Sequence, residues 1–302
     1  MTLASSAALN ECFGHDQRVV FSQGRGDLIK ADLDFKGARV EVYLQGAHIT
    51  RYRPRGDTDV LWMSDRAVYA PGGALRGGIP ICWPWFGAVT DGSGRPQHGY
   101  ARTHDFSVKS ANADDDSTSL VLALDSEQAP WPDWRGRLDL EFEIRLSDCL
   151  WMEMRTRNQT SEPIVVTNAL HSYFAISRRD RIRIPALTGL DYLDKTQDYR
   201  AFSQTDEIRI ETEVDRVYQQ PPAIIELHDD AWKTTTRIES WGNHNVVVWN
   251  PGPEKAAAMA DFDDPGFENM ICIEPANALD QGIELAPGEI QQLGQTLRTT
   301  GP

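Results

Sequence analysis

The chain has 302 residues, of which 40% are hydrophobic and 25% are charged, and its formal net charge is −15. This is the composition of an ordinary folded protein, and the excess of acidic residues disfavours nucleic acid and anionic membrane surfaces as partners. Because the chain contains no run of about 18 apolar residues, we expect no membrane-spanning helix.

The N-terminal segment and the cysteines indicate where the protein works. Residues 1–10 have neither a basic start nor an apolar stretch of signal-peptide length, so we expect a cytoplasmic protein. The four cysteines lie far apart and no two of them form a CxxC pair. This spacing argues against a zinc site and against a disulfide framework.

Apolar and polar residues alternate with period two in many segments, which is the pattern of half-buried antiparallel strands. The clearest case is residues 138–146, where five apolar side chains face one way and four charged side chains face the other. A short turn then leads into a second alternating segment. The predicted strands are, in chain order, residues 40–44, 119–124, 138–146, 150–156, 163–168, 181–187, 223–227, 234–238, 245–249, 269–274 and 291–297.

Helices and linkers are scarce. One short helix is predicted at residues 254–260, and residues 111–117, with three consecutive aspartates, are predicted to be a solvated hairpin tip rather than a domain boundary. No Pro/Ser-rich linker and no repeat of fixed period divides the chain. We therefore predict a single all-β domain over residues 1–302, of the sandwich type or a related architecture.

The most unusual stretch runs from Arg76 to Arg102 and contains RGGIPICWPWFG, a Gly-rich turn and QHGYAR. Its glycines allow close approach of the backbone to a ligand, and its aromatic rings offer flat faces on which sugars stack. The two arginines can each bind a phosphate or carboxylate through two nitrogens, and Gln97 and His98 can hydrogen-bond hydroxyls. Buried aromatic corners contain the same residue types, so composition alone leaves both interpretations open.

Three further residues stand out from the strand background. His171, in NALHSYF, is by itself more typical of a hydrogen-bonded core residue than of a catalyst. Glu274 lies in the apolar run ICIEPAN, where burial of a carboxylate without a partner or a purpose is costly, and this favours a functional role. Asp215 belongs to an acidic and aromatic stretch, residues 211–218, that by itself is typical of a solvated edge strand.

Six motifs, taken together and in this order, resemble those of the glucose-6-phosphate 1-epimerase branch of the aldose 1-epimerase family. They are RGGIPICWPWFG, QHGYAR, NALHSYF, EVDRVY, WNPG and CIEPAN, and they extend over most of the chain. The resemblance implies a galactose-mutarotase-like β-supersandwich, with the sugar site in a cleft on the concave face of the larger sheet. It also implies an isomerase of carbohydrate metabolism that acts on a small sugar phosphate.

The same resemblance implies a role for individual residues. His171 matches the family's catalytic acid and Glu274 matches its catalytic base. The loop of residues 88–96 is short and Gly-rich, so no substrate contact is carried over to it. The positions that match substrate-binding residues are Arg76, Gln97, Arg102 and Asp215, together with His98, where related mutarotases place a further histidine on the sugar.

The chemistry of anomer interconversion fits these residue types. A base removes the proton of the C1 hydroxyl and an acid protonates the ring oxygen; the ring then opens to the aldehyde, turns about the C1–C2 bond and recloses. Glu274 can be the base, and His171 can be the acid if nearby carboxylates, for which Glu274 and Asp215 are candidates, raise its pKa. No metal, nucleotide or redox cofactor is needed, and the chain has no Walker, Rossmann or HExxH motif.

Two other functions share these features. A mutarotase for neutral hexoses would use the same acid and base, and a non-catalytic carbohydrate-binding sandwich would keep the fold without turnover. The pair of Arg76 and Arg102 favours a phosphorylated sugar, because beside a neutral sugar two guanidinium groups would be desolvated without gain. The presence of both His171 and Glu274 favours an enzyme over a lectin. We expect a monomer, and the choice among glucose, galactose and mannose 6-phosphates stays open.

Overall fold

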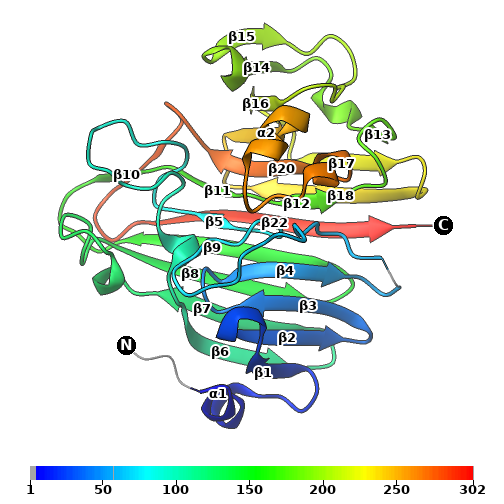
Figure 1. Ribbon diagram of the computed structural model, residues 1–302. Coiled ribbons are helices and arrows are strands. Elements are labelled where there is room, and N and C mark those ends of the chain that lie inside the picture. Colours follow the sequence, from blue (N-terminus) through cyan, green and yellow to red (C-terminus); the bar gives the residue numbers. More distant parts are fainter. Residues whose placement is uncertain (1–4, 57, 302) are drawn as a thin grey trace.

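The computed structural model describes residues 5–56 and 58–301, and strands dominate it (Figure 1). These residues include the α-helices α1 (Ser6–Phe13) and α2 (Gly252–Ala258). Short 3-10 helices lie at η1 (Arg25–Asp27), η2 (Ala101–Thr103), η3 (Ser126–Gln128), η4 (Pro185–Leu187), η5 (Lys195–Gln197) and η6 (Asp264–Glu268). Within the described ranges, no helix has the length and apolar character needed to cross a membrane.

An eight-stranded antiparallel sheet forms one layer of the fold. Its strands are, in spatial order, β13 (Ile182–Arg183), β17 (Ile224–Asp229), β18 (Thr234–Trp241), β22 (Ile290–Thr300), β9 (Leu150–Asn158), β8 (Leu138–Leu146), β7 (Thr118–Leu124) and β6 (Ser107–Ala113). The alternation predicted for residues 138–146 is confirmed, because the apolar side chains of β8 all belong to the buried core. The predicted hairpin is also present, with Leu146 opposite Leu150.

Two sheets form the facing layer. The first contains β1 (Val19–Gln23), β2 (Ile29–Phe35), β3 (Ala38–Tyr43) and β4 (His48–Arg53). The second contains β15 (Arg200–Ser203), β14 (Asp191–Asp194), β16 (Val214–Gln219), β19 (Asn245–Asn250), β20 (Met270–Asn277), β11 (Asn168–Leu170) and β5 (Ile81–Cys82), with β12 (Tyr173–Ala175) also paired to β20. A small separate sheet pairs β10 (Ile164–Val166) with β21 (Ile283–Leu285). Buried side chains from the three larger sheets form one continuous apolar core, so the predicted sandwich is confirmed.

Two predicted strands differ in detail. Residues 181–187 form only the short strand β13 before η4, because Pro185 has no N–H with which to continue a ladder. Residues 163–168 are divided between β10 and β11. The predicted hairpin tip at residues 111–117 is confirmed as the connection between β6 and β7.

Helix α1 was not predicted. It begins after Ser5, whose hydroxyl accepts a hydrogen bond from the Ala8 N–H, and Leu9 is its only buried residue. With one buried position the helix has little apolar periodicity for sequence analysis to detect. The predicted helix at residues 254–260 is α2, which begins at Gly252.

The acidic stretch at residues 211–218 is not a solvated edge strand. Its second half forms β16, which pairs with β14 on one side and β19 on the other. Asp215 is therefore held in the interior of a sheet and is 5% exposed.

Candidate active site

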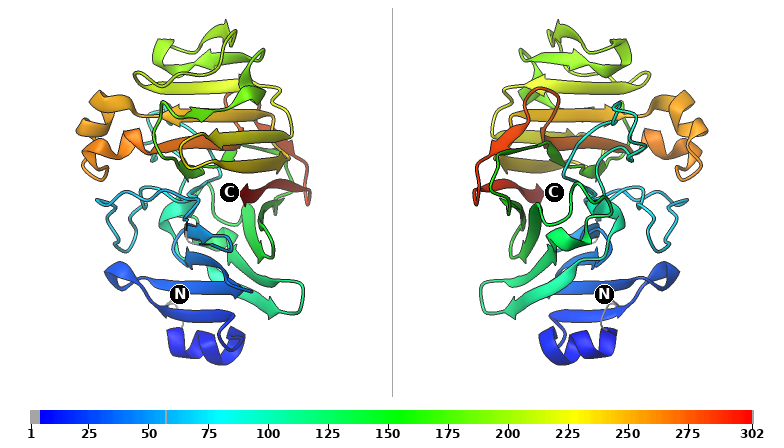
Figure 2. Two further views of the ribbon diagram at one scale, coloured as in Figure 1. Left: turned by 90° about the vertical axis from the view of Figure 1, so that its right-hand side faces the viewer. Right: turned by 90° about the vertical axis from the view of Figure 1, so that its left-hand side faces the viewer.

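The face of β16, β19 and β20 that points away from the sandwich core carries the candidate site. Successive residues of a strand point to opposite faces. On these strands the core between the layers takes up Val214, Val248, Ile271 and Ile273. The residues that follow each of them along the strand, namely Asp215, Trp249, Cys272 and Glu274, therefore point to the opposite face. In Figure 2 the orange helix α2 and the light-blue loops that precede β6 lie on one side of this sheet.

The strand register brings His171 opposite Glu274. β11 pairs with β20 through Asn168 and Asn277, and β12 pairs with it through Tyr173 and Cys272. His171 lies between these two strands, and continuing either register places it opposite Glu274. Its backbone N–H donates to the Pro80 carbonyl, which ties it to the stretch that begins at Arg76.

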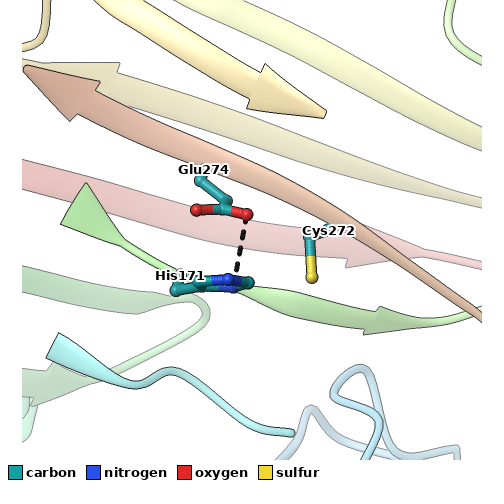
Figure 3. A group of neighbouring side chains, drawn as sticks. All are labelled: His171, Cys272 and Glu274. Carbon is teal, nitrogen blue, oxygen red and sulfur yellow. Dashed lines mark ion pairs between the residues drawn. The ribbon is translucent and has the colours of Figure 1, made fainter. Parts of the chain in front are cut away.

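The two side chains are in direct contact. His171 Nδ1 lies 3.2 Å from Glu274 Oε1, as the dashed line in Figure 3 marks. The imidazole ring stacks on Tyr173, with centroids 4.8 Å apart, and meets the edge of Trp249. His171 is 9% exposed and Glu274 is 1% exposed, so the pair is almost completely removed from water.

This burial shifts both groups toward their uncharged forms. The pKa of His171 lies well below 6.5 because of burial, followed by the influence of His98, Arg102 and Arg76. The pKa of Glu274 lies well above 4.5 because of burial and the nearby Asp215. The expectation that the pKa of His171 is raised is therefore wrong, since burial and the positively charged side chains around the site lower it.

The substrate-binding residues predicted from the sequence line one pocket with this pair, except for Arg102, which is not among the lining residues. The lining consists of Arg76, Phe86, Gln97, His98, His171, Lys195, Asp215, Val247, Trp249, Lys255, Met259 and Glu274.

His98 reaches the pocket through an unusual backbone conformation. Its φ is 65°, a left-handed value that is uncommon outside glycine and often marks functional sites. The next residue must be glycine, because a Cβ on Gly99 would lie 1.8 Å from the carbonyl oxygen of Trp83. The rings of His98 and His171 meet edge to face, with their centroids 5.8 Å apart. The pKa of His98 is lowered to about 3 by burial and by nearby positively charged side chains, of which Arg102 has the largest effect.

The two arginines that bracket the stretch have different surroundings. Arg76 lines the pocket, donates to the Tyr173 hydroxyl and forms an ion pair with Asp261 at 3.2 Å. Arg102 donates to the backbone carbonyl of Gln97 at 2.8 Å instead. Among the described residues the buried Arg102 Nε has no hydrogen-bond partner.

Two lysines in the pocket were missed by sequence analysis. Lys195 follows β14 and donates to Asp215 at 2.8 Å, and Lys255 on α2 forms an ion pair with Glu213. Burial raises the pKa of Asp215, although Lys195 opposes this shift. Both lysines lie in polar segments that resemble any solvated turn or helix, so no local signal distinguishes them.

A larger cavity, of about 760 Å³, lies elsewhere, lined by residues that include Arg55, Asp59, Trp232 and Thr236. It contains no histidine and no adjacent acid–base pair among its lining residues. The smaller pocket around His171 and Glu274 is therefore the better candidate for chemistry.

The chain is similar to known proteins over most of its length. The profile of the family described as "Aldose 1-epimerase" matches residues 29–298. A Salmonella typhimurium protein named "Putative glucose-6-phosphate 1-epimerase" is 33% identical over 269 residues, which cover 88% of this chain and 90% of that protein. A protein of the same name from Cenchrus ciliaris is 36% identical over 272 residues, covering 84% and 80% of the two chains.

Solved structures share the fold. The crystal structure of a putative mutarotase, YeaD, from Salmonella typhimurium superposes with a TM-score of 0.87 at 30% identity and covers 95% of each chain. The crystal structure of HI1317 superposes with a TM-score of 0.77 at 22% identity, covering 94% of this chain and 96% of that one. The galactose-mutarotase-like β-supersandwich predicted from the sequence is therefore confirmed.

Proposed function

The chain belongs to the aldose 1-epimerase family, and we propose that it interconverts the α and β anomers of hexose 6-phosphates, with glucose 6-phosphate as the substrate. The observation that carries this proposal is the buried contact between His171 and Glu274 in a pocket that is also lined by positively charged side chains. The names of its relatives, glucose-6-phosphate 1-epimerase, support the same substrate.

In the proposed reaction Glu274 accepts the proton of the C1 hydroxyl and His171 donates a proton to the ring oxygen. Both oxygens are bonded to C1, so two side chains in direct contact with each other can reach both. The ring opens to the aldehyde, the C1–C2 bond rotates, and reclosure on the other face returns the two protons with the roles reversed.

The pKa shifts of the pair suit this exchange. A carboxylate whose pKa is raised is a stronger base, and an imidazolium whose pKa is lowered is a stronger acid. In the uncharged pair the proton is on the Glu274 carboxyl group and the imidazole is neutral; in the ion pair the same proton is on His171 and Glu274 is a carboxylate. The shifts favour the uncharged pair at rest, and transfer of one proton from Glu274 to His171 creates the reactive ion pair.

The charge of the pocket supports a phosphorylated sugar. Arg76, Lys195 and Lys255 all line it, in a chain whose net charge is −15. Each of these side chains forms an ion pair with a carboxylate of the protein. A bound phosphate would therefore share each positive charge with that carboxylate. We propose that Arg76 contacts the phosphate and that Arg102 contacts it or positions Gln97 beside the sugar.

The acid–base assignment is tested by NMR exchange between the two anomers of glucose 6-phosphate, measured above the spontaneous rate. We expect His171→Asn and Glu274→Gln each to lower turnover by roughly 10²–10⁴-fold, with the fold retained. Glu226→Gln, the same chemical change on β17 in the other sheet, is the control. Near-normal turnover in either pocket variant would reject the assignment.

The substrate is tested by the ratio of kcat/KM for glucose 6-phosphate to kcat/KM for glucose. Loss of a charge-assisted hydrogen bond of about 1.5–3 kcal/mol should lower this ratio by roughly one to two powers of ten in Arg76→Ala. Arg102→Ala should lower the ratio as well if Arg102 contacts the phosphate, and should leave the ratio unchanged if Arg102 only positions Gln97. Arg237→Ala on β18 is the control. A wild-type protein without preference for the phosphate would be a mutarotase for neutral hexoses, and binding without turnover would indicate a carbohydrate-binding sandwich.

A further inference from the structure

A thiol lies beside the acid–base pair and takes no part in the proposed reaction. Cys272 precedes Glu274 by two residues on β20, so both side chains point from the same face of the sheet. Figure 3 shows the sulfur next to the His171 ring. Cys272 is fully buried, and burial together with Glu274 raises its pKa well above 9, so the free thiol is a poor nucleophile.

The three side chains form a compact set of metal donors. A ring nitrogen of His171, the sulfur of Cys272 and a carboxylate oxygen of Glu274 all lie within 4.8 Å of one another. In a zinc tetrahedron with bonds of about 2.0–2.3 Å, donor atoms are roughly 3.3–3.6 Å apart. The nitrogen and oxygen, 3.2 Å apart, are already close to this spacing, and a thiol shift of about 1 Å would complete the set.

An unpartnered polar atom also points to a ligand here. Among the described residues, Glu274 Oε2 is buried without a hydrogen-bond partner, whereas Oε1 of the same carboxyl group faces His171 Nδ1 at 3.2 Å. A carboxylate oxygen at this depth is costly to leave unpaired, and a cation would satisfy it. A thiolate and a carboxylate would balance the charge of a divalent cation, with neutral imidazole as third ligand and the pocket side open for a fourth.

We propose that His171, Cys272 and Glu274 bind a thiophilic divalent cation such as Zn²⁺, and that the bound cation inhibits the enzyme. Binding releases the thiol proton, and any proton on Glu274, to solvent. The cation then occupies the two groups that exchange protons with the sugar, so cation and sugar exclude each other. The absence of CxxC spacing does not bear on this site, because only one of its three ligands is a cysteine and His171 comes from a distant segment of the chain. Only the inhibition rests on the proposed function; the binding does not.

Cation binding is tested first, with Co²⁺ as a spectroscopic substitute for Zn²⁺. Thiolate ligation produces a charge-transfer band in the near ultraviolet, which we expect at one equivalent of Co²⁺ and which Zn²⁺ should remove. The proteins carry Cys12→Ser, because Cys12 is exposed and would bind metal by itself. The band should be absent in Cys272→Ala and retained in Cys82→Ala, which removes another buried thiol. Zn²⁺ affinity should fall at least roughly 10–100-fold in Cys272→Ala.

Inhibition is tested in the mutarotation assay. Zn²⁺ should inhibit the wild type and Cys82→Ala competitively with the sugar, Mg²⁺ should not, and Cys272→Ala should keep its activity at Zn²⁺ concentrations that inhibit the wild type. Absence of the cobalt band in the wild type, or its persistence in Cys272→Ala, would overturn the proposal. Cys272→Ser gives the same readout if the alanine variant does not fold. A Cys272-dependent band in a protein without mutarotase activity would refute the proposed function and leave the cation site standing.

Discussion

Replacing Glu274 with Gln removes a carboxyl group that is 1% exposed, and its effect on stability should depend on pH. Because the pKa of Glu274 is raised on folding, its contribution to stability is fully present below the unfolded value of 4.5 and is lost as pH rises through the folded value. His171 behaves in the opposite way. Its pKa is lowered on folding, so its contribution is present above 6.5 and is lost as pH falls.

The size of the effect follows from one proton per group. Such a group changes the free energy of unfolding by up to about 1.4 kcal/mol per pH unit. In the wild type the two slopes oppose each other where the pH lies above 4.5 and above the folded pKa of His171 but below 6.5. Above pH 6.5 the rising slope of His171 ends, and any falling slope of Glu274 continues only up to the folded pKa of Glu274. In Glu274→Gln stability should rise up to pH 6.5 and then stay level, because the falling slope is removed while burial, the main cause of the His171 shift, is unchanged.

Urea unfolding of the two proteins, in steps from about pH 5 to about pH 8, measures this difference. As the pH rises toward the folded pKa of Glu274, the free energy of unfolding of Glu274→Gln should increase relative to that of the wild type by up to about 1.4 kcal/mol per pH unit. His171→Gln should show only the falling slope, and the double variant should show neither. Parallel curves for the wild type and Glu274→Gln would mean that Glu274 titrates normally in the folded protein, and the reasoning would be refuted.

Two further predictions concern the residues around the pair. Gly99→Ala should lower the free energy of unfolding, measured in urea, by more than about 3 kcal/mol, because the new Cβ would overlap the Trp83 carbonyl oxygen. Gly94→Ala is the control: its φ is also positive but no atom lies within 4 Å, so it should cost about 1–2 kcal/mol. Equal losses in the two variants would contradict the steric argument. Lys195→Met removes the cation that donates to Asp215 and should raise the pKa of that carboxyl further, as ¹³C NMR would show. An unchanged pKa would mean that the ion pair is not formed in solution.

Local patterns in the sequence determined much of the fold. The period of two in residues 138–146 was sufficient to predict β8, because each strand of a two-layer sandwich buries one face. The apolar neighbours of Glu274 were sufficient to predict its burial, and this prediction is confirmed. Where the pattern is weak, as in α1 with its one buried residue, prediction failed.

The tertiary structure alone decided which groups meet and how they titrate. The contact between His171 and Glu274 depends on the register of β11 and β12 against β20, and no local pattern encodes strand pairing over that separation. Lys195 became part of the pocket through tertiary packing as well. The direction of the His171 pKa shift was predicted wrongly because it depends on the balance between burial and all the surrounding charges. That balance exists only after distant segments of the chain have packed together and excluded water.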